Sequence, residues 1–462
     1  MAPTSSNIVT GGRGKDWIRW TVSVLLGCCI GILFFYTTGQ MSSYETSYPR
    51  AFHPPAPVKN STANGETNSM QSSLYKGSLE FFNKLPKVRV PSINCAALFE
   101  GIEKEVQNAK SLMKSSPKKI IPDKDILNDA SNCDKFVRDR QYIMSTLSRE
   151  EEEYPIAYSM VVFKEVEQVE RLLRAIYRPQ NLYCFHVDKK SPENFYIAVR
   201  QISNCFENVF IASKRIDVQW GQYSVLEADL ICMEELLKKS RKWKYFINLT
   251  GQEFPLKTNL ELVKILKTYN GANDIEGTVK RRNMNRFKDL PTPPYNITPM
   301  KGSVHIVASR PFVDFVLNDP KAKEFHEWDK KAGIPDESFF TTLNHNPQLG
   351  APGAFTGKDP ETHPEKKPFN TRFKNWGDWP FDYPCHGKRV RMVCIFGIGD
   401  LPLLMQRKEF FSNKFYLDYE PLAYDCMEEL HYNRTMAAYM LPFDNSYYKN
   451  LSYVRNHVKV KW

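Results

Sequence analysis

The sequence lacks the short glycine-rich motifs of the common nucleotide-binding folds. None of its 462 residues form a GxxxxGK[ST] segment, which excludes a P-loop enzyme. No GxGxxG follows the first predicted strand, which argues against a simple dinucleotide-binding domain. No CxxC pair occurs among the ten cysteines, so a structural zinc site is not expected. We also find no internal repeat.

The sequence has no long runs of one charge either. Its formal net charge is +11, but the basic residues are dispersed rather than packed into arms. This pattern does not indicate a nucleic-acid binder, and a basic groove for an anionic small molecule fits it as well. Because 42% of the residues are hydrophobic and 13% are aromatic, most of the chain should fold around a core.

Charge is absent altogether from the run Trp20–Tyr36 near the N-terminus. The run is at the lower end of what spans a bilayer, and it is longer than a usual signal-peptide core. Arg13, Lys15 and Arg19 precede it, and the next basic residue is Arg50, so the C-terminal bulk is predicted to lie in a lumen or outside the cell. A cleaved signal peptide is the competing interpretation, against which the long polar leader argues. The short span also suits the thinner membranes of the early secretory pathway.

The chain is therefore predicted to have four parts. The segment that follows the anchor is rich in Ser, Thr, Asn and Pro and poor in aliphatic residues, which is typical of a stem. The parts are a cytoplasmic tail (1–16), a transmembrane signal anchor (17–37), a stem (38–90) and a luminal catalytic domain (91–462).

Cysteines and glycosylation sequons agree with a luminal domain. Two cysteines lie in the predicted span, and the eight beyond it suggest four disulfides in an oxidising compartment, although spacing alone allows about 105 pairings. Asn248 begins a sequon inside a strand-like run, so we expect it to be buried and unmodified. Four sequons lie in polar stretches and are predicted to be N-glycosylated: Asn60, Asn296, Asn433 and Asn450.

Hydrophobic patterning predicts an α/β fold. Residues 91–150 have helical patterns, and from residue 156 strand-like and helix-like segments alternate as far as residue 250. This alternation is typical of a mostly parallel, Rossmann-like sheet with helices on both faces. Residues 290–380 are rich in Pro, Asn and aromatic residues, and we expect them to be irregular and functional.

Several long segments resemble one enzyme family. They are RLLRAIYRPQNLYCFHVDKKS, NCFENVFIAS and WKYFINLTGQEFPLKTNLELV, followed in order by PDESFF, VRMVCIFGIGDL and NKF. These segments resemble the core 2/I-branching β-1,6-N-acetylglucosaminyltransferases (glycosyltransferase family 14), and the resemblance covers most of residues 95–430. It implies a single disulfide-bonded glycosyltransferase domain with a GT-A-like fold. The disulfides it implies are Cys95–Cys426, Cys133–Cys205, Cys184–Cys232 and Cys385–Cys394.

The resemblance also implies a reaction and a location. The enzyme would be a single-pass type II Golgi membrane protein that transfers GlcNAc from UDP-GlcNAc to the 6-hydroxyl of GalNAc or Gal, with inversion. It would need no metal and no other cofactor. Asp188 ends the predicted strand 182–187, but His186 stands where a DxD motif would have its first carboxylate, and two lysines follow. One carboxylate beside two cations makes a poor Mg²⁺ site.

Donor-binding residues follow from the family's motifs. The resemblance implies that Asp188 accepts a hydrogen bond from the uracil, with Trp220 beside the base and Val161 nearby; the alternative for Asp188 is a strand-end charge paired with Lys189. Cations suit the leaving diphosphate, and the family match selects Arg391 and Lys414. In the cysteine-bounded segment CHGKRVRMVC, hairpin alternation would place Arg391 on the same face as Arg389. We interpret Lys388 and Arg389 as ordinary surface charges.

The resemblance further implies that Glu337 is the general base, since one ionised carboxylate opposite the leaving group is enough for single-step inversion. We expect the start of a helix to keep Glu337 ionised and Asp336 to act locally. The acceptor-binding residues implied are Glu276, Arg286 and Trp376. Asn283 stands where the family has a lysine, and Asp378 where it has a tyrosine.

Core 2 branching of mucin-type O-glycans is thus the predicted function. Alternatives are I-branching of Gal, another donor such as UDP-xylose, and a catalytically silent glycan-binding membrane protein. The expected partners are a UDP-sugar, an O-glycan on a glycoprotein and the membrane, with a homodimer left open.

Overall fold

The computed structural model of the chain describes residues 89–377 and 383–462. The predicted cytoplasmic tail, the membrane anchor and nearly all of the stem, with Asn60, lie outside the described residues. Among the helices that are described, none combines the length and the apolar character that crossing a bilayer requires.

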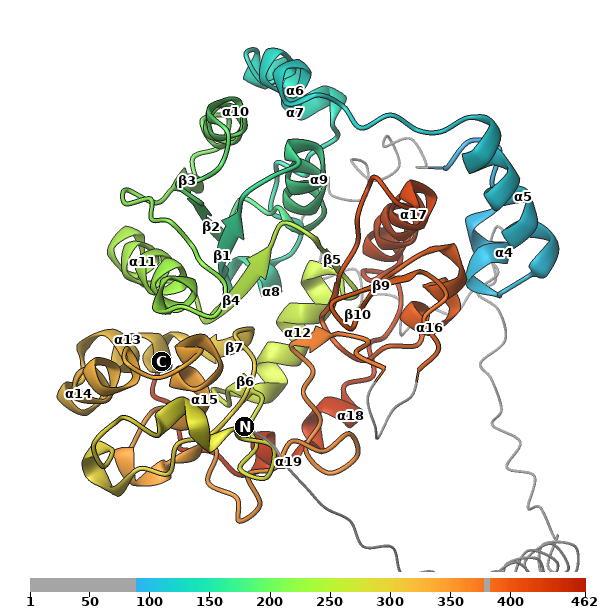
Figure 1. Cartoon of the computed structure of the whole chain (residues 1–462). Helices are drawn as coiled ribbons and strands as arrows, with labels where there is room; N and C mark the ends of the chain where they lie inside the picture. Colours follow the sequence, from blue (N-terminus) through green and yellow to red (C-terminus); the bar gives the residue numbers. More distant parts are fainter. Residues whose placement is uncertain (1–88, 378–382) are drawn as a thin grey trace, which may run out of the picture. The chain divides into compact units, whose positions relative to one another are not determined.

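A six-stranded sheet forms the centre of the described domain, in the order β3-β2-β1-β4-β7-β6 (Figure 1). Strands β3, β2, β1 and β4 are parallel, whereas β7 is antiparallel to both β4 and β6. The sheet is therefore mostly parallel, as predicted. Its strands are β1 (Ile156–Val162), β2 (Leu182–Val187), β3 (Val209–Ile211), β4 (Tyr245–Thr250), β6 (Asp274–Ile275) and β7 (Ile306–Ser309).

Helices cover both faces of this sheet because its strands are apolar on both sides. In β1, Ile156, Tyr158 and Met160 belong to one hydrophobic cluster, while Ala157 belongs to another on the opposite face. The first cluster takes in α9 (Val166–Ile176), α10 (Glu193–Ser203) and α12 (Asn259–Tyr269). The second takes in α11 (Tyr223–Lys239), α13 (Arg310–Asn318), α14 (Pro320–Asp329) and α15 (Phe339–His345). The predicted mixed α/β architecture is confirmed.

A smaller sheet extends the domain beyond β4. Its strand order is β5-β11-β8, with β11 antiparallel to β5 and parallel to β8. A third hydrophobic cluster lies between it and four helices. These elements are β5 (Glu253–Pro255), β8 (Arg372–Phe373), β11 (Phe411–Asn413), α4 (Cys95–Phe99), α5 (Glu103–Ser115), α16 (Leu401–Met405) and α17 (Pro421–Ala437).

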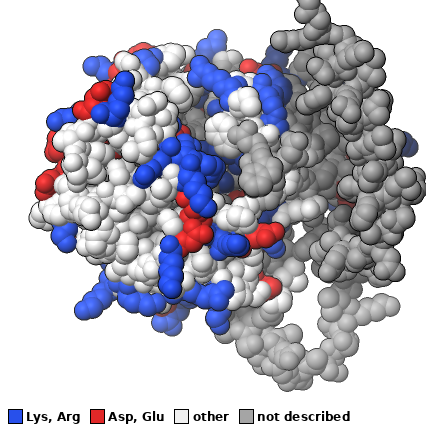
Figure 2. All heavy atoms as spheres, turned by 60° about the horizontal axis from the view of Figure 1, so that its bottom comes forward, with Lys and Arg blue, Asp and Glu red and all other residues white. Residues whose placement is uncertain are grey.

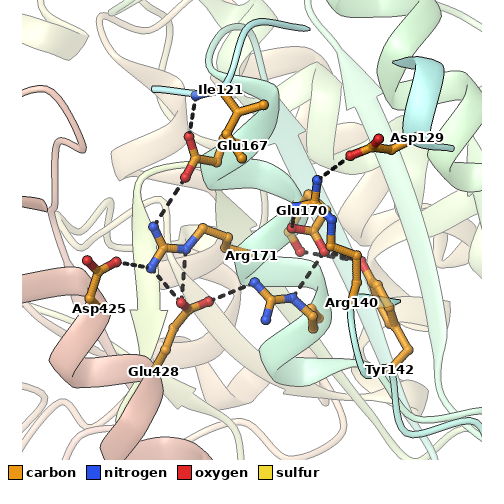
Figure 3. A network of polar contacts seen from close by, with 10 residues as sticks. Ile121, Asp129, Arg140, Tyr142, Glu167, Glu170, Arg171, Asp425 and Glu428 are labelled. Carbon is orange, nitrogen blue, oxygen red and sulfur yellow. Dashed lines mark hydrogen bonds and ion pairs between the residues drawn. The ribbon is translucent and has the colours of Figure 1, made fainter. Parts of the chain in front are cut away.

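Buried ion pairs join α17 to α9 (Figure 3). Arg171 on α9 contacts Asp425 at 2.6 Å, and its Nε donates to Glu428 at 3.0 Å. Arg174 bridges Glu170 at 3.1 Å and Glu428 at 3.1 Å. Removing one member of such a network leaves a buried charge without compensation, so the network fixes the smaller sheet and α17 against the larger one.

Four disulfides are present, and they are the four pairs that the family resemblance implies. The separations along the chain range from 9 to 331 residues. The pairs are Cys95–Cys426, Cys133–Cys205, Cys184–Cys232 and Cys385–Cys394. The remaining short helices of the described chain are α6 (Asp123–Asp129), α7 (Cys133–Asp139), α8 (Arg149–Glu152), α18 (Ser446–Lys449) and α19 (Ser452–Arg455).

The prediction that residues 290–380 are irregular is wrong for their middle part. Strand β7 and helices α13, α14 and α15 lie there. Pro311 and Pro320 occupy the first turns of α13 and α14, where a missing N–H costs nothing. The prolines thus mark helix starts, although in the sequence they resemble loop signals.

The sequons differ in exposure. Asn248 is buried in β4, and its amide donates to Asp229 at 2.7 Å and to the Val304 carbonyl at 2.8 Å, which confirms that it is buried. Asn296, Asn433 and Asn450 are exposed, as glycosylation would require.

Candidate active site

The site residues predicted from the sequence lie mainly where strands of the two sheets end. Asp188 follows β2, and Lys414 follows β11. Lys164 lies two residues after the end of β1 (Ile156–Val162), and its ammonium lies 5.1 Å from the centre of the Tyr416 ring. The Lys414 ammonium lies 5.9 Å from the centre of the same ring. The carboxyl ends of strands are where open α/β sheets bind ligands.

Asp188 is held by a lysine ammonium. The Lys190 ammonium lies 3.1 Å from the Asp188 carboxylate, and it also contacts Asp217. The Lys190 backbone N–H donates to Asp188 at 2.9 Å. The alternative interpretation of Asp188 named Lys189, and the structure corrects it to Lys190. A single ammonium therefore lies between two carboxylates.

Trp220 belongs to the loop that precedes α11, and its side chain is 80% exposed. Gly221 has a positive φ of +76° and lies against the side chain of Ile334, three residues before Glu337. The Trp220 loop is therefore next to the turn that carries Glu337. Val161 is partly buried near the end of β1, one strand from Asp188.

Arg391 is in a two-residue hairpin turn between β9 (Lys388–Val390) and β10 (Val393–Ile395). Arg391 and Met392 have φ of +48° and +73°, the values that turns of this kind require. The prediction that Arg391 shares a face with Arg389 by strand alternation is therefore wrong, because the turn interrupts the alternation. The Arg389 guanidinium donates instead to the carbonyls of Met392 and Asn375.

The hairpin lies beside Lys414. The Phe396 N–H donates to the Lys414 carbonyl at 3.0 Å. Burial lowers the pKa of Lys414, and Arg391 lowers it further. Among the described residues, neither Arg391 nor Lys414 forms an ion pair with a carboxylate. Lys388, interpreted from the sequence as a surface charge, contacts the rings of Tyr416 and Tyr419, so it belongs to the same cationic cluster.

Glu337 ends a short 3₁₀ turn, Pro335–Glu337, just before α15. Its carboxylate receives a hydrogen bond from Arg286 at 2.7 Å, and Lys301 lies 3.8 Å away. The predicted acceptor residue Arg286 thus contacts the predicted base directly. The charged groups near the Glu337 carboxylate are the side chains of Arg286 and Lys301.

Two buried carboxyl groups lie behind Glu337. Ser338 Oγ donates to Asp329 at 2.7 Å. Burial raises the pKa of Asp329 to about 8, and burial together with Glu337 raises the pKa of Asp336 to about 7. One oxygen of each carboxyl has no hydrogen-bond partner. The protonated form is favoured near neutral pH for Asp329 and below neutral pH for Asp336, which limits the negative charge around Glu337.

Glu276 follows β6 and points toward the basic segment after it. Arg281 lies 3.5 Å from its carboxylate, and the Glu276 carbonyl accepts from Thr341 Oγ1 at 2.6 Å. The face of the domain shown in Figure 2 gathers Lys and Arg side chains around acidic ones. Trp376 is 44% exposed. Asp378, two residues further along the chain, lies outside the described residues.

Sequence reasoning missed a buried polar group beneath these residues. Glu253 is fully buried at the start of β5 and contacts His305 at 2.8 Å and Arg372 at 3.1 Å. Its carboxylate also accepts from Asn413, the residue before Lys414, at 2.9 Å. Burial lowers the pKa of His305 to about 3, so this imidazole is neutral, and Arg372 keeps Glu253 ionised. No motif could have found this group, because its members come from four distant elements.

Metal-ligating geometry is scarce in the described part of the chain. The one cluster of three metal-ligating side chains found among these residues is Cys385, Cys394 and Asp400, and its two cysteines are joined in a disulfide. Cations and carboxylates at the strand ends of a mixed α/β domain suit an anionic ligand.

Comparison with known proteins defines the family. The model of the core-2/I-branching enzymes matches residues 156–404. The human β-1,3-galactosyl-O-glycosyl-glycoprotein β-1,6-N-acetylglucosaminyltransferase 3 is 38% identical over 401 residues, which cover 81% of this chain and 90% of the relative. The sheep (Ovis aries) enzyme of that name and a similarly named enzyme of Bovine herpesvirus 4 are each 38% identical over 398 residues, or 81% of this chain and 89% of the relative. The chain therefore belongs to the core-2/I-branching family of glycosyltransferases, which confirms the resemblance.

Proposed function

We propose that the protein is an inverting enzyme that transfers GlcNAc from UDP-GlcNAc to the 6-hydroxyl of GalNAc, forming the core 2 branch of mucin-type O-glycans. The names of the relatives support GlcNAc transfer and a β-1,6 product. The observation that carries the proposal is the charge balance of the site. Arg391 and Lys414 lack carboxylate partners within the described chain, which suits a dianionic leaving group, whereas Glu337 already has Arg286.

Five residues bind the donor in this proposal. Asp188 and Trp220 hold the uracil, with Val161 beside them, while Arg391 and Lys414 contact the diphosphate. Negative charge grows on the β-phosphate as the glycosidic bond breaks, and fixed cations stabilise that charge without reorganising. These assignments correspond to donor binding in a GT-A-like fold.

Glu337 activates the acceptor in this proposal. Glu337 takes the proton of the 6-hydroxyl while that oxygen forms its bond to C1 of GlcNAc. The bond from C1 to the UDP oxygen breaks in the same displacement, and UDP leaves with the electron pair. Attack opposite to the leaving group inverts the anomeric centre, so one carboxylate is sufficient. Glu276, Arg286 and Trp376 orient the acceptor sugar.

The reaction is proposed to need no divalent cation. The Lys190 ammonium lies between Asp188 and Asp217, where a metal would otherwise be drawn by paired carboxylates. Activity should survive dialysis against EDTA. Loss of turnover in EDTA that Mn²⁺ restores would contradict the assignment.

Location and assembly are part of the proposal. The chain is anchored by residues 17–37 as a single-pass type II Golgi protein, with the catalytic domain in the lumen and N-glycans on its sequons. Immunofluorescence with a C-terminal epitope tag tests this topology, since the tag should be protected from antibody until the Golgi membrane is opened. A homodimer would appear in light scattering of the purified protein.

Linkage analysis of the product tests the function itself. Core 1 disaccharide, an N-acetyllactosamine acceptor and UDP-GlcNAc or UDP-xylose are offered in all combinations. A β-1,6-GlcNAc branch on GalNAc is expected. Branching only on Gal would indicate the I-branching alternative, transfer only of xylose would indicate the other donor, and binding of glycan without UDP release would indicate a silent lectin-like protein.

A further inference from the structure

Lys374 is a partly buried cation that the reaction described above does not use. It follows β8 directly, and its ammonium has one recorded hydrogen bond, to Ser303 Oγ at 3.4 Å. Among the described residues it forms no ion pair with a carboxylate. An ammonium carries three donors, so at least two of them have no recorded protein partner.

The segment Lys301–Ser303 connects the surroundings of Lys374 to the backbones of Glu276 and Glu337. The Gly302 N–H donates to the Glu337 carbonyl at 2.7 Å. Gly302 also lies so close to the Glu276 carbonyl that a Cβ there would collide with it. Ser303, the next residue, accepts the bond from Lys374. Two consecutive residues, Gly302 and Ser303, therefore contact Glu337, Glu276 and Lys374 between them.

The charges around Lys374 come from several elements. Burial lowers its pKa to about 8, although Glu253, Glu276 and Glu337 oppose this, and Arg372 adds to it. Lys374 thus differs from Arg286 and Arg281, each of which already contacts a carboxylate. Among the described residues, the hydrogen-bond partner of its ammonium is a neutral hydroxyl, Ser303 Oγ.

We propose that Lys374 is a further acceptor-binding residue, whose ammonium donates a hydrogen bond to a hydroxyl of the sugar held between Glu276 and Glu337. The inference rests on the proposed function. A sugar hydroxyl both donates and accepts, so a carboxylate and an ammonium on either side of the acceptor satisfy neighbouring hydroxyls together. Charged donors in such pairs give directional and strong hydrogen bonds.

The competing effect is an indirect one on the donor. Glu253 lies within the electrostatic reach of Lys374 and bonds Asn413, which precedes Lys414. Loss of Lys374 could therefore disturb the diphosphate site. The experiment must separate acceptor binding from UDP binding.

Steady-state kinetics of full-length Lys374→Met with UDP-GlcNAc and a p-nitrophenyl core 1 disaccharide test the proposal. The acceptor KM should rise about 10- to 100-fold, the loss expected for one charged hydrogen bond. UDP affinity by calorimetry should stay within about twofold. Lys374→Arg should recover part of the acceptor affinity and extend activity above pH 8, since a guanidinium stays charged there. Lys323→Met, at an exposed position of α14, is the control.

Each other outcome overturns the inference. An unchanged acceptor KM in Lys374→Met, or an equal loss of UDP affinity, contradicts it. If Lys374→Met fails to fold, Lys374→Arg decides, because an alkaline limb identical to the wild type would also contradict it. If the wild-type protein transfers GlcNAc and the variants keep the wild-type acceptor KM, only the role of Lys374 is refuted. If the wild-type protein transfers no GlcNAc, the proposed function and this inference are refuted together.

Discussion

The two halves of the site differ in how their charges are balanced. On the proposed donor side, neither Arg391 nor Lys414 forms an ion pair with a carboxylate in the described chain, and burial together with the nearby Arg391 charge lowers the pKa of Lys414. On the acceptor side, Glu337 and Glu276 are each matched by an arginine, at 2.7 Å and 3.5 Å. The two cations of the first arrangement have no ion-pair partner among the described residues, whereas each carboxylate of the second has one.

The difference indicates what each half is built to bind. Like charges held together cost free energy that a diphosphate would recover, so the proposed donor side suits a negative ligand. A neutral sugar brings no charge, so the acceptor side has to be compensated by the protein itself. The charge pattern of a site thus suggests the charge of its ligand.

The largest effect is expected for Glu337→Gln. The amide keeps the size of the side chain and can still accept from Arg286, but it cannot take a proton. Transfer should fall by about 10²- to 10⁴-fold. Rate measurements should be paired with UDP calorimetry, which should give unchanged affinity. Near-normal turnover would remove the role of Glu337 and with it the division between the two halves.

Removing a donor-side cation should have the next largest effect. Arg391→Ala and Lys414→Ala should each weaken UDP binding by about 10- to 100-fold, since each removes a charged contact. Calorimetry with UDP and with uridine separates the causes, because uridine lacks phosphate and its affinity should not change. Arg389→Ala is the matched control on the same hairpin. Equal losses in all three variants would indicate a damaged hairpin instead of a phosphate site.

Opening the hairpin disulfide should affect the donor side alone. Cys385 and Cys394 are nine residues apart and close the loop that carries Arg391. The chain-entropy account assigns a loop of that size about 2–3 kcal/mol. The double variant with serine at both positions should lose several-fold in UDP affinity, while the acceptor KM, measured at saturating donor, stays the same. A change in acceptor KM of similar size would show that the halves are coupled.

Asp329→Asn should have the smallest effect on catalysis and act on stability instead. Burial raises the pKa of Asp329 from 3.8 to about 8, so the folded state binds a proton that the unfolded state releases between these values. The free energy of unfolding therefore falls as the pH rises from about 4 to 8. Asparagine cannot titrate and can still accept from Ser338, so thermal melts of the variant should depend less on pH over this range. Asp418→Asn, on an exposed loop, should keep the wild-type slope.

The sequence was informative where structure is local. The alternating apolar segments predict β1, α9 and β2 because each is decided by its own residues and its own period. The segment that contains β7, α13 and α14 was misjudged because Pro311 and Pro320 have the same appearance in a loop and in a helix start.

Features that depend on tertiary contacts were not predictable in the same way. The turn at Arg391 and Met392 has positive φ at two residues that carry side chains, and neither is a glycine or asparagine that would signal it. Lys190 rather than Lys189 holds Asp188 because Asp217, from another loop, is on its other side. No pattern in the sequence near Lys374 indicates that its ammonium donates a hydrogen bond to Ser303.

The disulfide between Cys95 and Cys426 has a consequence for how the protein is made. Its two sulfurs are separated by 331 residues, so the bond cannot close until nearly the whole domain has left the ribosome. Until then Cys95 is a free thiol near the start of the nascent domain, while the Cys184–Cys232 pair, only 48 residues apart, can already oxidise. The Cys95–Cys426 bond therefore joins the beginning of the domain to its last long helix only after that helix has been synthesised.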